Sequence, residues 1–349
     1  MNFCSDNVAG AAPAVLEALT AGASGTAMPY GNDPATARVG KRLEALFGTA
    51  LAAFPVATGT AANALALSVV TPPYGAVYCH RDSHINVDEC GAPELFTGGA
   101  KLMPLDGAHG KLDPETLSTA LARGGAGDVH HVQPAALSLS QATEAGTVYA
   151  PDEVRALADI AHTHGLAVHM DGARFANAVA SLGCTPAELS WKAGIDVLSF
   201  GATKNGCLAA EAVLFFDPAR AGDFVYRRKR GGHLFSKMRF VSLQLDAYLA
   251  DGLWLDLARH ANTQAGRLAE GLGALEGAVL IHPVQANEIF VRLPEPVLDG
   301  LESAGFGFYR WDGTVIRLVT AFNTDPAHVD ALIAAARRLS AEAGARKMA

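Results

Sequence analysis

The sequence predicts an α/β protein with a mostly parallel, helix-covered sheet and a small C-terminal α+β domain. Three observations predict this fold. Short apolar strands alternate with amphipathic helices to about residue 240, and such alternation is typical of parallel sheets. A long helical region follows from about 241 to 275, and the last part of the chain returns to short strands and helices. We therefore expect a large domain over residues 1–245 and a small domain over residues 246–349. A (β/α)8 barrel is the rival topology, but the terminal lobe and the uneven strand spacing argue against it.

The individual elements follow from hydrophobic periodicity and from Gly and Pro punctuation. In the large domain, helices are predicted over residues 12–19, 36–47, 61–70, 113–121 and 151–164, and strands over 51–57, 76–79, 166–170, 195–200 and 211–216. In the small domain, strands are predicted over 278–282, 289–293 and 315–319, and helices over 296–304 and 326–339. The small polar residues 138–146 are interpreted as a loop.

The helix at 151–164 has the clearest boundaries. Pro151 stands in its first turn, followed by the acidic residues Asp152 and Glu153, and Gly165 follows its last turn. Proline and acids favour a helix N-terminus, and glycine favours the stop.

Composition narrows the class of protein. The 349 residues carry a net charge of −8, which gives no general electrostatic footprint for nucleic acid or an anionic membrane. The N-terminus lacks a signal-peptide profile, and no uncharged apolar run reaches membrane-spanning length. Five cysteines without CxxC spacing fit a reduced protein and not a disulfide frame or structural zinc. We expect a cytoplasmic protein with no metal site.

The functional prediction starts from the stretch 169–205. Asp171 follows one apolar strand, and Lys204 follows the next. Ligands of open α/β sheets bind outside the carboxyl ends of the strands, so both side chains should face one crevice. An acid that holds a pyridinium nitrogen and a lysine that forms a Schiff base are the pair that pyridoxal phosphate (PLP) enzymes use. An ion pair at the sheet edge is the alternative interpretation.

A second feature favours an anion. The residues Thr58-Gly59-Thr60 lie between a predicted strand and a predicted helix. Free backbone N–H groups at a helix start, together with hydroxyl groups, form a phosphate cradle. An ordinary strand–helix connection with a threonine cap is the alternative.

Taken together, these blocks resemble the low-specificity L-threonine aldolase family of fold-type I PLP enzymes. The resemblance runs nearly end to end, and it looks most like the bacterial branch that also cleaves phenylserine. It rests on Ser5-Asp6-Asn7, Tyr30-Gly31-Asn32-Asp33, Thr58-Gly59-Thr60-Ala61-Ala62-Asn63, Ser83-His84-Ile85, His130-His131, Asp171-Gly172-Ala173-Arg174 and Thr203-Lys204-Asn205.

For the cofactor, the resemblance implies an aspartate-aminotransferase-like large domain with a seven-stranded sheet. Lys204 would carry PLP as a Schiff base, and Asp171 would face the pyridine nitrogen. The phosphate would contact Thr58, Gly59, Thr60 and Thr203. Arg174 and Arg239 are further expected cofactor contacts.

For the substrate, the resemblance implies a carboxylate held by Arg174 and Arg317, with Ser5 as a third contact. A structural salt bridge is the alternative for Arg317. Lys229 lies with Arg239 in a basic segment, for which a solvated loop is the blander explanation. Tyr30 would reach the site of a neighbouring subunit, since fold-type I sites form at dimer interfaces. A homodimer or homotetramer is therefore expected.

Two histidines are expected near the reacting atoms. His84 would stack on the cofactor ring or transfer protons, and His131 would lie near the substrate hydroxyl. A strand-end histidine is the alternative for His131. The base that removes the β-hydroxyl proton is left open between His84, His131 and a water molecule.

The implied reaction is retro-aldol cleavage of L-threonine, L-allo-threonine or phenylserine to glycine and an aldehyde. A β-eliminating lyase or an aminotransferase on the same scaffold is the first alternative, and a non-catalytic binding protein is the second. Asn32 and the segment Gln141-Ala142-Thr143-Glu144 depart from the commoner branch of the family. These departures leave the preferred aldehyde open.

Overall fold

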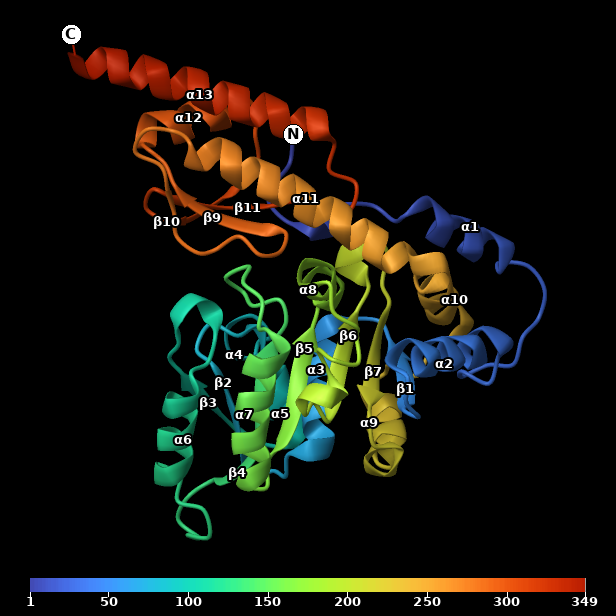
Figure 1. Cartoon of the computed structure of the whole chain (residues 1–349). Coiled ribbons are helices and arrows are strands. Elements are labelled where there is room, and N and C mark those ends of the chain that lie inside the picture. Colours follow the sequence, from blue (N-terminus) through green and yellow to red (C-terminus); the bar gives the residue numbers. More distant parts are fainter. Residues whose placement is uncertain (349) are drawn as a thin grey trace.

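The computed structural model describes residues 1–348 and consists of two lobes (Figure 1). The large lobe is built on a seven-stranded sheet. Its strand order is β1 (Ala52–Val56), β7 (Glu211–Phe215), β6 (Val197–Gly201), β5 (Ala167–Gly172), β4 (Gln133–Ser140), β2 (Gly75–His80) and β3 (Lys101–Leu105). The five strands from β3 to β6 are parallel, while β7 runs antiparallel to β6 and β1 antiparallel to β7. The predicted fold class is confirmed.

Helices cover the sheet, as the complete burial of β2, β5, β6 and β7 requires. The helices of the large lobe are α1 (Pro13–Ala21), α2 (Pro34–Phe47), α3 (Gly59–Val70), α4 (His84–Val87), α5 (Ala92–Thr97), α6 (Pro114–Arg123), α7 (Pro151–Thr163), α8 (Phe175–Leu182), α9 (Phe224–Arg230) and α10 (Arg239–Tyr248). Two short 3-10 helices, η1 (Asp6–Val8) and η4 (Thr203–Asn205), lie near the carboxyl end of the sheet.

The small lobe packs helices on one antiparallel sheet. Its strand order is β10 (Tyr309–Asp312), β11 (Val315–Val319), β9 (Glu288–Arg292) and β8 (Val279–Leu280), and its helices are α11 (Leu253–Gly273), α12 (Glu295–Ser303) and α13 (Pro326–Met348). The helix α11 packs against α8 of the large lobe and α13 of the small lobe. A division of the chain near residues 245 and 246 stays a proposal.

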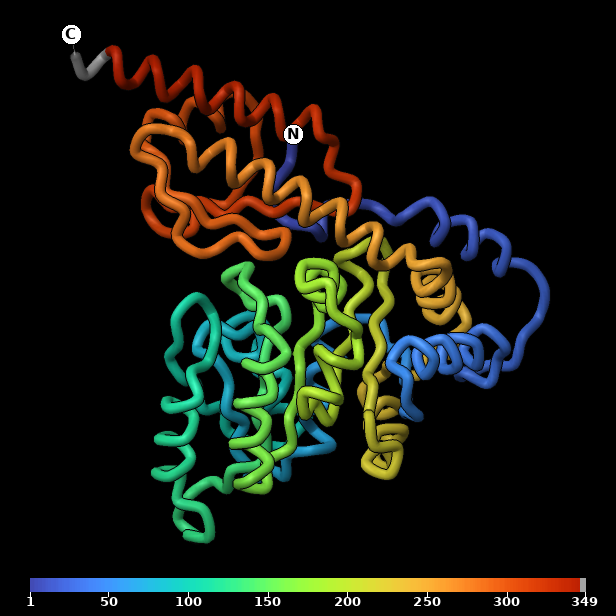
Figure 2. Tube along the Cα trace, viewed as in Figure 1, coloured from blue at the N-terminus to red at the C-terminus, as the bar shows by residue number. Residues whose placement is uncertain are grey.

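The N-terminal segment lies against the small lobe (Figure 2). Phe3 is 1% exposed and belongs to the small-lobe hydrophobic core. Its backbone N–H donates to Gly307, and its carbonyl accepts from Val319, both at 2.8 Å. This pairing fixes the residues that follow, including η1, at the junction of the two lobes.

The structure corrects three details of the predicted elements. Residues 133–140 form the strand β4, so the predicted loop begins later than expected. The helical region 241–275 is broken at Asp251 and Gly252, which both have positive φ angles. Neither β3 nor β10 was predicted. The apolar run of β3 is short and interrupted by Pro104, and β10 is exposed and mixes aromatic with charged residues.

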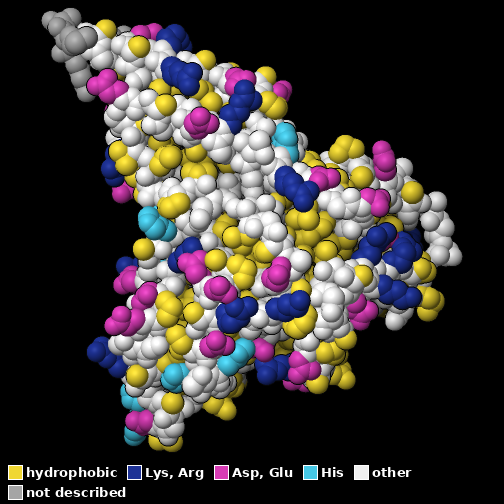
Figure 3. Space-filling model, viewed as in Figure 1, with side chains coloured by type: hydrophobic (Ala, Val, Ile, Leu, Met, Phe, Trp, Pro, Cys, Tyr) yellow, Lys and Arg dark blue, Asp and Glu magenta, His cyan; other side chains and the backbone are white. Residues whose placement is uncertain are grey.

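The surface carries both acidic and basic side chains, as expected from 35 Asp and Glu and 27 Lys and Arg residues in the sequence. On the face drawn in Figure 3, acidic and basic side chains are interspersed. Within residues 1–348, no helix combines the length and the apolar character needed to cross a membrane.

Candidate active site

A cavity of about 340 Å³ opens where the parallel strands of the large sheet end. This volume falls within the range of small-molecule sites. It is lined by Asn7, Ala57, Thr58, Gly59, Thr60, Asn63, His84, Glu89, Ser140, Ala142, Glu144, Asp171, Ala173, Arg174, Thr203, Lys204, Leu208, Ala209 and Glu211. Eight predicted site residues are among them: Thr58, Gly59, Thr60, His84, Asp171, Arg174, Thr203 and Lys204.

Asp171 stands near the end of β5 and is 7% exposed. One of its oxygens accepts from the Asn63 side-chain amide at 2.7 Å, and the other accepts from the Ala173 N–H at 3.0 Å. The same Asn63 amide nitrogen donates to Glu89 at 2.9 Å. Asn63, on the first turns of α3, therefore ties two cavity carboxylates together.

His84 opens the short helix α4 and faces Glu89. Its Nδ1 lies 2.9 Å from Glu89 Oε1, and the Glu89 side chain is fully buried. The hydrogen bond to Glu89 is the largest influence on His84, and it raises the pKa of the imidazole. Burial raises the pKa of Glu89. The hydrogen bond to Glu89 holds the imidazole in a fixed orientation.

Thr58 caps the N-terminus of α3 by accepting from the Ala61 N–H at 3.2 Å. A Cβ atom added to Gly59 would meet nothing within 4 Å, so there is open space above the start of the helix. The first backbone N–H groups of a helix have no intrahelical partner and attract an anion. Thr203 lies on the same cavity, and its hydroxyl accepts from the Ala210 N–H at 3.1 Å.

Lys204 reaches the cavity from η4, directly after β6. The turn before it is fixed by Glu211, the first residue of β7, whose carboxylate accepts from the Ala202 N–H at 2.9 Å. Burial raises the pKa of Glu211 to about 7, against the lowering effect of the nearby Lys204 charge.

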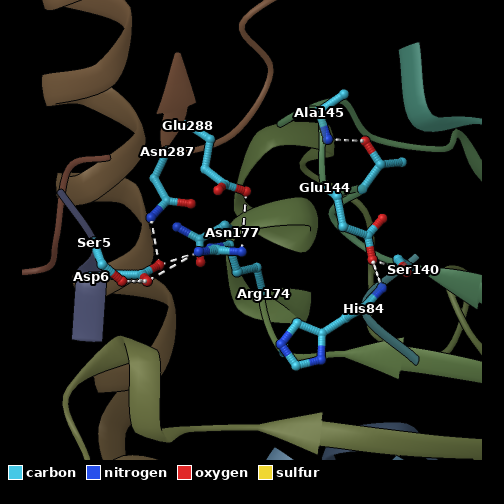
Figure 4. A network of polar contacts seen from close by, with 12 residues as sticks. Ser5, Asp6, His84, Ser140, Glu144, Ala145, Arg174, Asn177, Asn287 and Glu288 are labelled. Carbon is cyan, nitrogen blue, oxygen red and sulfur yellow. Dashed lines mark hydrogen bonds and ion pairs between the residues drawn. The ribbon is translucent and has the colours of Figure 1, made fainter. Parts of the chain in front are cut away.

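Arg174 is held by acids from two distant parts of the chain (Figure 4). Asp6 of η1 accepts from its Nε at 2.8 Å and its Nη2 at 3.0 Å, and Glu288 of β9 lies 3.1 Å from its Nη1. Asn287 also donates to Asp6, at 3.0 Å. Burial raises the pKa of Glu288. The guanidinium therefore joins the N-terminal segment, the large lobe and the small lobe.

Arg317 lies next to this cluster, on β11. Its Nη2 donates to the Cys4 carbonyl at 3.1 Å, whereas its Nη1 is 3.9 Å from Glu288. Its Nε is buried without a partner among the described residues. Ser5 is close by in sequence, and its hydroxyl accepts from the Asn7 N–H at 3.1 Å. Neither Arg317 nor Ser5 lines the cavity. Arg317 is nevertheless linked through Glu288 to the cavity residue Arg174, and its Nε is free to donate a hydrogen bond.

The prediction for His131 needs correction. Its side chain is 56% exposed and lies 3.6 Å from Asp128. It precedes β4, which begins at Gln133 and reaches the cavity only at Ser140. His131 is therefore at the opposite end of the sheet, where it cannot meet a substrate bound in this cavity. The alternative interpretation, a histidine at a strand end, fits the position of His131.

Three other predicted residues lie outside the cavity lining. The Lys229 ammonium is 4.7 Å from the centre of the Tyr30 ring on the exposed surface. Arg239, at the start of α10, lies over the Phe240 ring at 5.0 Å. Its Nε is buried without a partner among residues 1–348.

Five acidic residues and one amide of the site were not predicted: Asp6, Asn63, Glu89, Glu144, Glu211 and Glu288. Signals for some of them were present in the sequence. Asn63 lies one turn from the predicted phosphate cradle, and Glu89 follows His84 by five residues. Glu288 stands at the start of an apolar strand, where a buried acid requires a cationic partner.

The residues present fit PLP. The start of α3 offers open space and N–H groups to a phosphate, and Asp171 offers a buried carboxylate to a ring nitrogen. His84 offers a flat imidazole, and Lys204 offers an amine to the same cavity. All four groups surround one volume, as a single cofactor would require.

Comparisons with known proteins agree with this site. The profile of the Beta-eliminating lyase family matches residues 2–296. The low specificity L-threonine aldolase of a Pseudomonas species is 44% identical over 95% of this chain and 96% of its own. The enzyme of that name from Pseudomonas aeruginosa is 45% identical over 93% of both chains.

Two solved structures also resemble this chain. A threonine aldolase from Leishmania major matches with a TM-score of 0.92 and 26% identity, over 97% of this chain and 99% of its own. A serine palmitoyltransferase from Sphingomonas wittichii, at 16% identity and a TM-score of 0.74, shares the fold over 99% of this chain and 88% of its own.

Proposed function

This chain belongs to the Beta-eliminating lyase family and is a PLP-dependent lyase of the threonine aldolase type; we propose that it cleaves L-threonine, L-allo-threonine and phenylserine to glycine and an aldehyde. The observation that carries the proposal is the meeting of Lys204, Asp171 and the α3 N-terminus in one cavity. Two relatives named low specificity L-threonine aldolase, which are 44–45% identical over more than nine-tenths of this chain, support the proposal.

We propose that Lys204 holds PLP as a Schiff base. Asp171 would keep the ring nitrogen protonated, His84 would lie against the ring, and Gly59, Thr60 and Thr203 would hold the phosphate. When bound, PLP supplies an electron sink for the pair released at the substrate Cα. The hydrogen bonds to Asp171 from Asn63 and Ala173 hold its carboxylate in a fixed position for this role.

The substrate carboxylate would be held at the edge of the cavity. Arg317 has an N–H group available for it, at Nε, whereas the Arg174 fork is already occupied by Asp6. Arg174 would then contribute positive charge and position Arg317 through their shared partner Glu288. Fixing the carboxylate decides which bond at Cα stands perpendicular to the cofactor ring and therefore breaks.

We propose a cytoplasmic homodimer or homotetramer, in which Tyr30, Lys229 and Arg239 contribute to a neighbouring site. Large exposed apolar side chains support an interface on the large lobe, with Leu95 74% and Tyr226 75% exposed. The five cysteines are all free thiols, which is in keeping with a reducing compartment.

The proposal is tested by incubating the purified protein with PLP and each of the three amino acids. We expect equal amounts of glycine and of acetaldehyde or benzaldehyde, without a keto acid. Pyruvate or another keto acid would instead identify a β-eliminating lyase or an aminotransferase. The absence of both products would refute the proposed activity.

A further inference from the structure

Ser140 and Glu144 form a polar pair beside the cofactor site that none of the roles above uses. Ser140 is the last residue of β4, and Glu144 lies in the loop between β4 and α7. The Ser140 hydroxyl donates to Glu144 Oε1 at 2.6 Å, and the His84 N–H donates to the same oxygen at 2.8 Å. Both side chains line the cavity. Figure 4 shows the Glu144 carboxylate beside Ser140 and the His84 backbone.

The loop that carries Glu144 is firmly held. The Gln141 side chain donates to the Tyr149 carbonyl at 2.8 Å and accepts from the Tyr149 N–H at 3.0 Å, so it spans the loop. Thr143 and Thr147 join their hydroxyls at 2.8 Å within it. Such cross-links fix the carboxylate of Glu144 to one position, which a group that exchanges a proton with a bound substrate requires.

Glu144 is also suited to proton exchange by its surroundings. Burial raises the pKa of Glu144 to about 7, and the hydrogen bonds from Ser140 and His84 act against that rise. Its Oε2 is buried without a partner among the described residues. A pKa near the working pH is optimal for a general base. The Asp171 charge also raises the pKa of Glu144, and the Glu144 charge in turn raises the pKa of Cys79, Tyr149 and Arg174.

The other acids at the cavity and its edge have structural partners that occupy them. Asp171 is bound by Asn63 and Ala173, and Glu89 is bound by His84 and Asn63. Glu211 fixes the turn before Lys204, while Asp6 and Glu288 bind Arg174. Glu144, in contrast, accepts at 2.6 Å from the hydroxyl group of Ser140, which itself lines the cavity beside His84.

We propose that Glu144 is the acceptor of the substrate β-hydroxyl proton, which reaches it through the hydroxyl of Ser140. This assignment rests on the proposed aldolase function. The proposed base is therefore Glu144 and not His84, His131 or a water molecule. Its link to the substrate is the hydrogen bond from Ser140.

The proposed step balances as follows. The substrate hydroxyl proton moves to Ser140 Oγ while the Ser140 proton moves to Glu144 Oε1. The Cα–Cβ bond breaks, its electron pair stays at Cα, and the former hydroxyl oxygen forms the carbonyl of the aldehyde. Glu144 then releases its proton to water, and Cα receives one from water, which gives glycine.

The test compares two reactions of the PLP-loaded protein. Glu144→Gln should slow aldehyde release from threonine by about 10²–10⁴-fold, the usual contribution of a general base. The same variant should still exchange the α-hydrogen of glycine with solvent deuterium within a few-fold of the unmodified protein, because glycine has no hydroxyl group. Equal loss of both reactions would overturn the proposal, since it would indicate a structural role for Glu144.

A pH profile separates Glu144 from His84. In the unmodified protein, kcat/KM should rise with pH to a plateau above about 7. This acidic limb should be absent from the residual activity of Glu144→Gln and retained in His84→Asn. The opposite pattern would assign the proton to His84. Ser140→Thr, which keeps a hydroxyl group, should retain activity that Ser140→Ala loses.

The ionisation of Glu144 can also be measured directly, without catalysis. Infrared difference spectra of the cofactor-free protein between pH 6 and 8 should show buried carboxyl groups that ionise near pH 7, namely Glu144 and Glu211. Glu144→Gln should remove one of the two signals, while Glu115→Gln on the exposed surface of α6 should change neither. An unchanged spectrum in Glu144→Gln would overturn the assignment. If the unmodified protein forms no aldehyde at all, the proposed function fails instead.

Discussion

Replacing Asp6 by asparagine should destabilise the whole chain. The Asp6 carboxylate is 2% exposed, and it accepts two hydrogen bonds from Arg174 and one from Asn287. Removing one partner of a buried ion pair typically costs about 3–5 kcal/mol. Because Glu288 would remain 3.1 Å from Arg174, we expect the lower end of that range. A loss of about 3 kcal/mol corresponds to a change of roughly 150-fold in the folding equilibrium constant.

The effect of Asp6→Asn should depend on pH with a definite sign. Burial opposes ionisation, but the charges of Arg174 and Lys204 and the hydrogen bonds from Arg174 and Asn287 hold the pKa of Asp6 below its ordinary value of 3.8. A carboxylate with a lowered pKa contributes its full stability above the unfolded-state pKa. That contribution is lost as the pH falls through the folded-state pKa. The difference between the two proteins should therefore be constant from pH 8 to 5 and shrink below pH 4.

Urea denaturation followed by circular dichroism, at one protein concentration and several pH values, measures this difference. Asp152→Asn is the matched control, since the Asp152 side chain is 92% exposed and pairs with Arg155 on the surface of α7. Exposed pairs contribute at most about 1 kcal/mol. The reasoning fails if Asp6→Asn unfolds as the control does at pH 7, or if the difference grows on acidification.

Three further outcomes are expected. Lys204→Ala should release no aldehyde and show no violet absorbance band after incubation with PLP; undiminished turnover would contradict the assignment. Arg317→Leu should raise KM for threonine by roughly 10- to 150-fold, from the 1.5–3 kcal/mol of a charged hydrogen bond, whereas Arg292→Leu on the exposed end of β9 should leave KM unchanged. Glu89→Gln should lower the pKa of His84, because it removes the carboxylate that raises it; imidazole NMR signals of the cofactor-free protein measure that shift, and an unmoved titration would disprove the pairing.

Local patterns predicted the centre of the site well. Asp171 and Lys204 follow adjacent buried strands, and the carboxyl ends of parallel strands meet at one edge, so their proximity follows from the fold class. The phosphate cradle follows from a strand, a glycine and a helix start in sequence. These predictions required no knowledge of side-chain contacts, since the backbone topology alone brings the residues together.

Other parts of the site depend on distant contacts that sequence patterns do not encode. The partners of Arg174 lie 168 residues before it and 114 residues after it (6 to 174, and 174 to 288). His131 was expected near the substrate from the family resemblance alone. It stands two residues before β4, whose other end, at Ser140, reaches the cavity. Arg317 was placed on the correct strand, but the carbonyl and rings that surround it come from Cys4, Tyr309 and Trp311.

The pairing of the first residues with the small lobe has a consequence for synthesis of the chain on the ribosome. The amino group of Met1 donates to the carbonyl of Gly305, 304 residues later. At a translation rate of about 5–20 residues per second, Gly305 is made roughly 15–60 s after Met1. Until then Asp6 has no small-lobe segment to hold it against Arg174. The segment that carries Asp6 can thus take its place only after the small lobe has been made, because Asn287, which donates to Asp6, follows it by 281 residues.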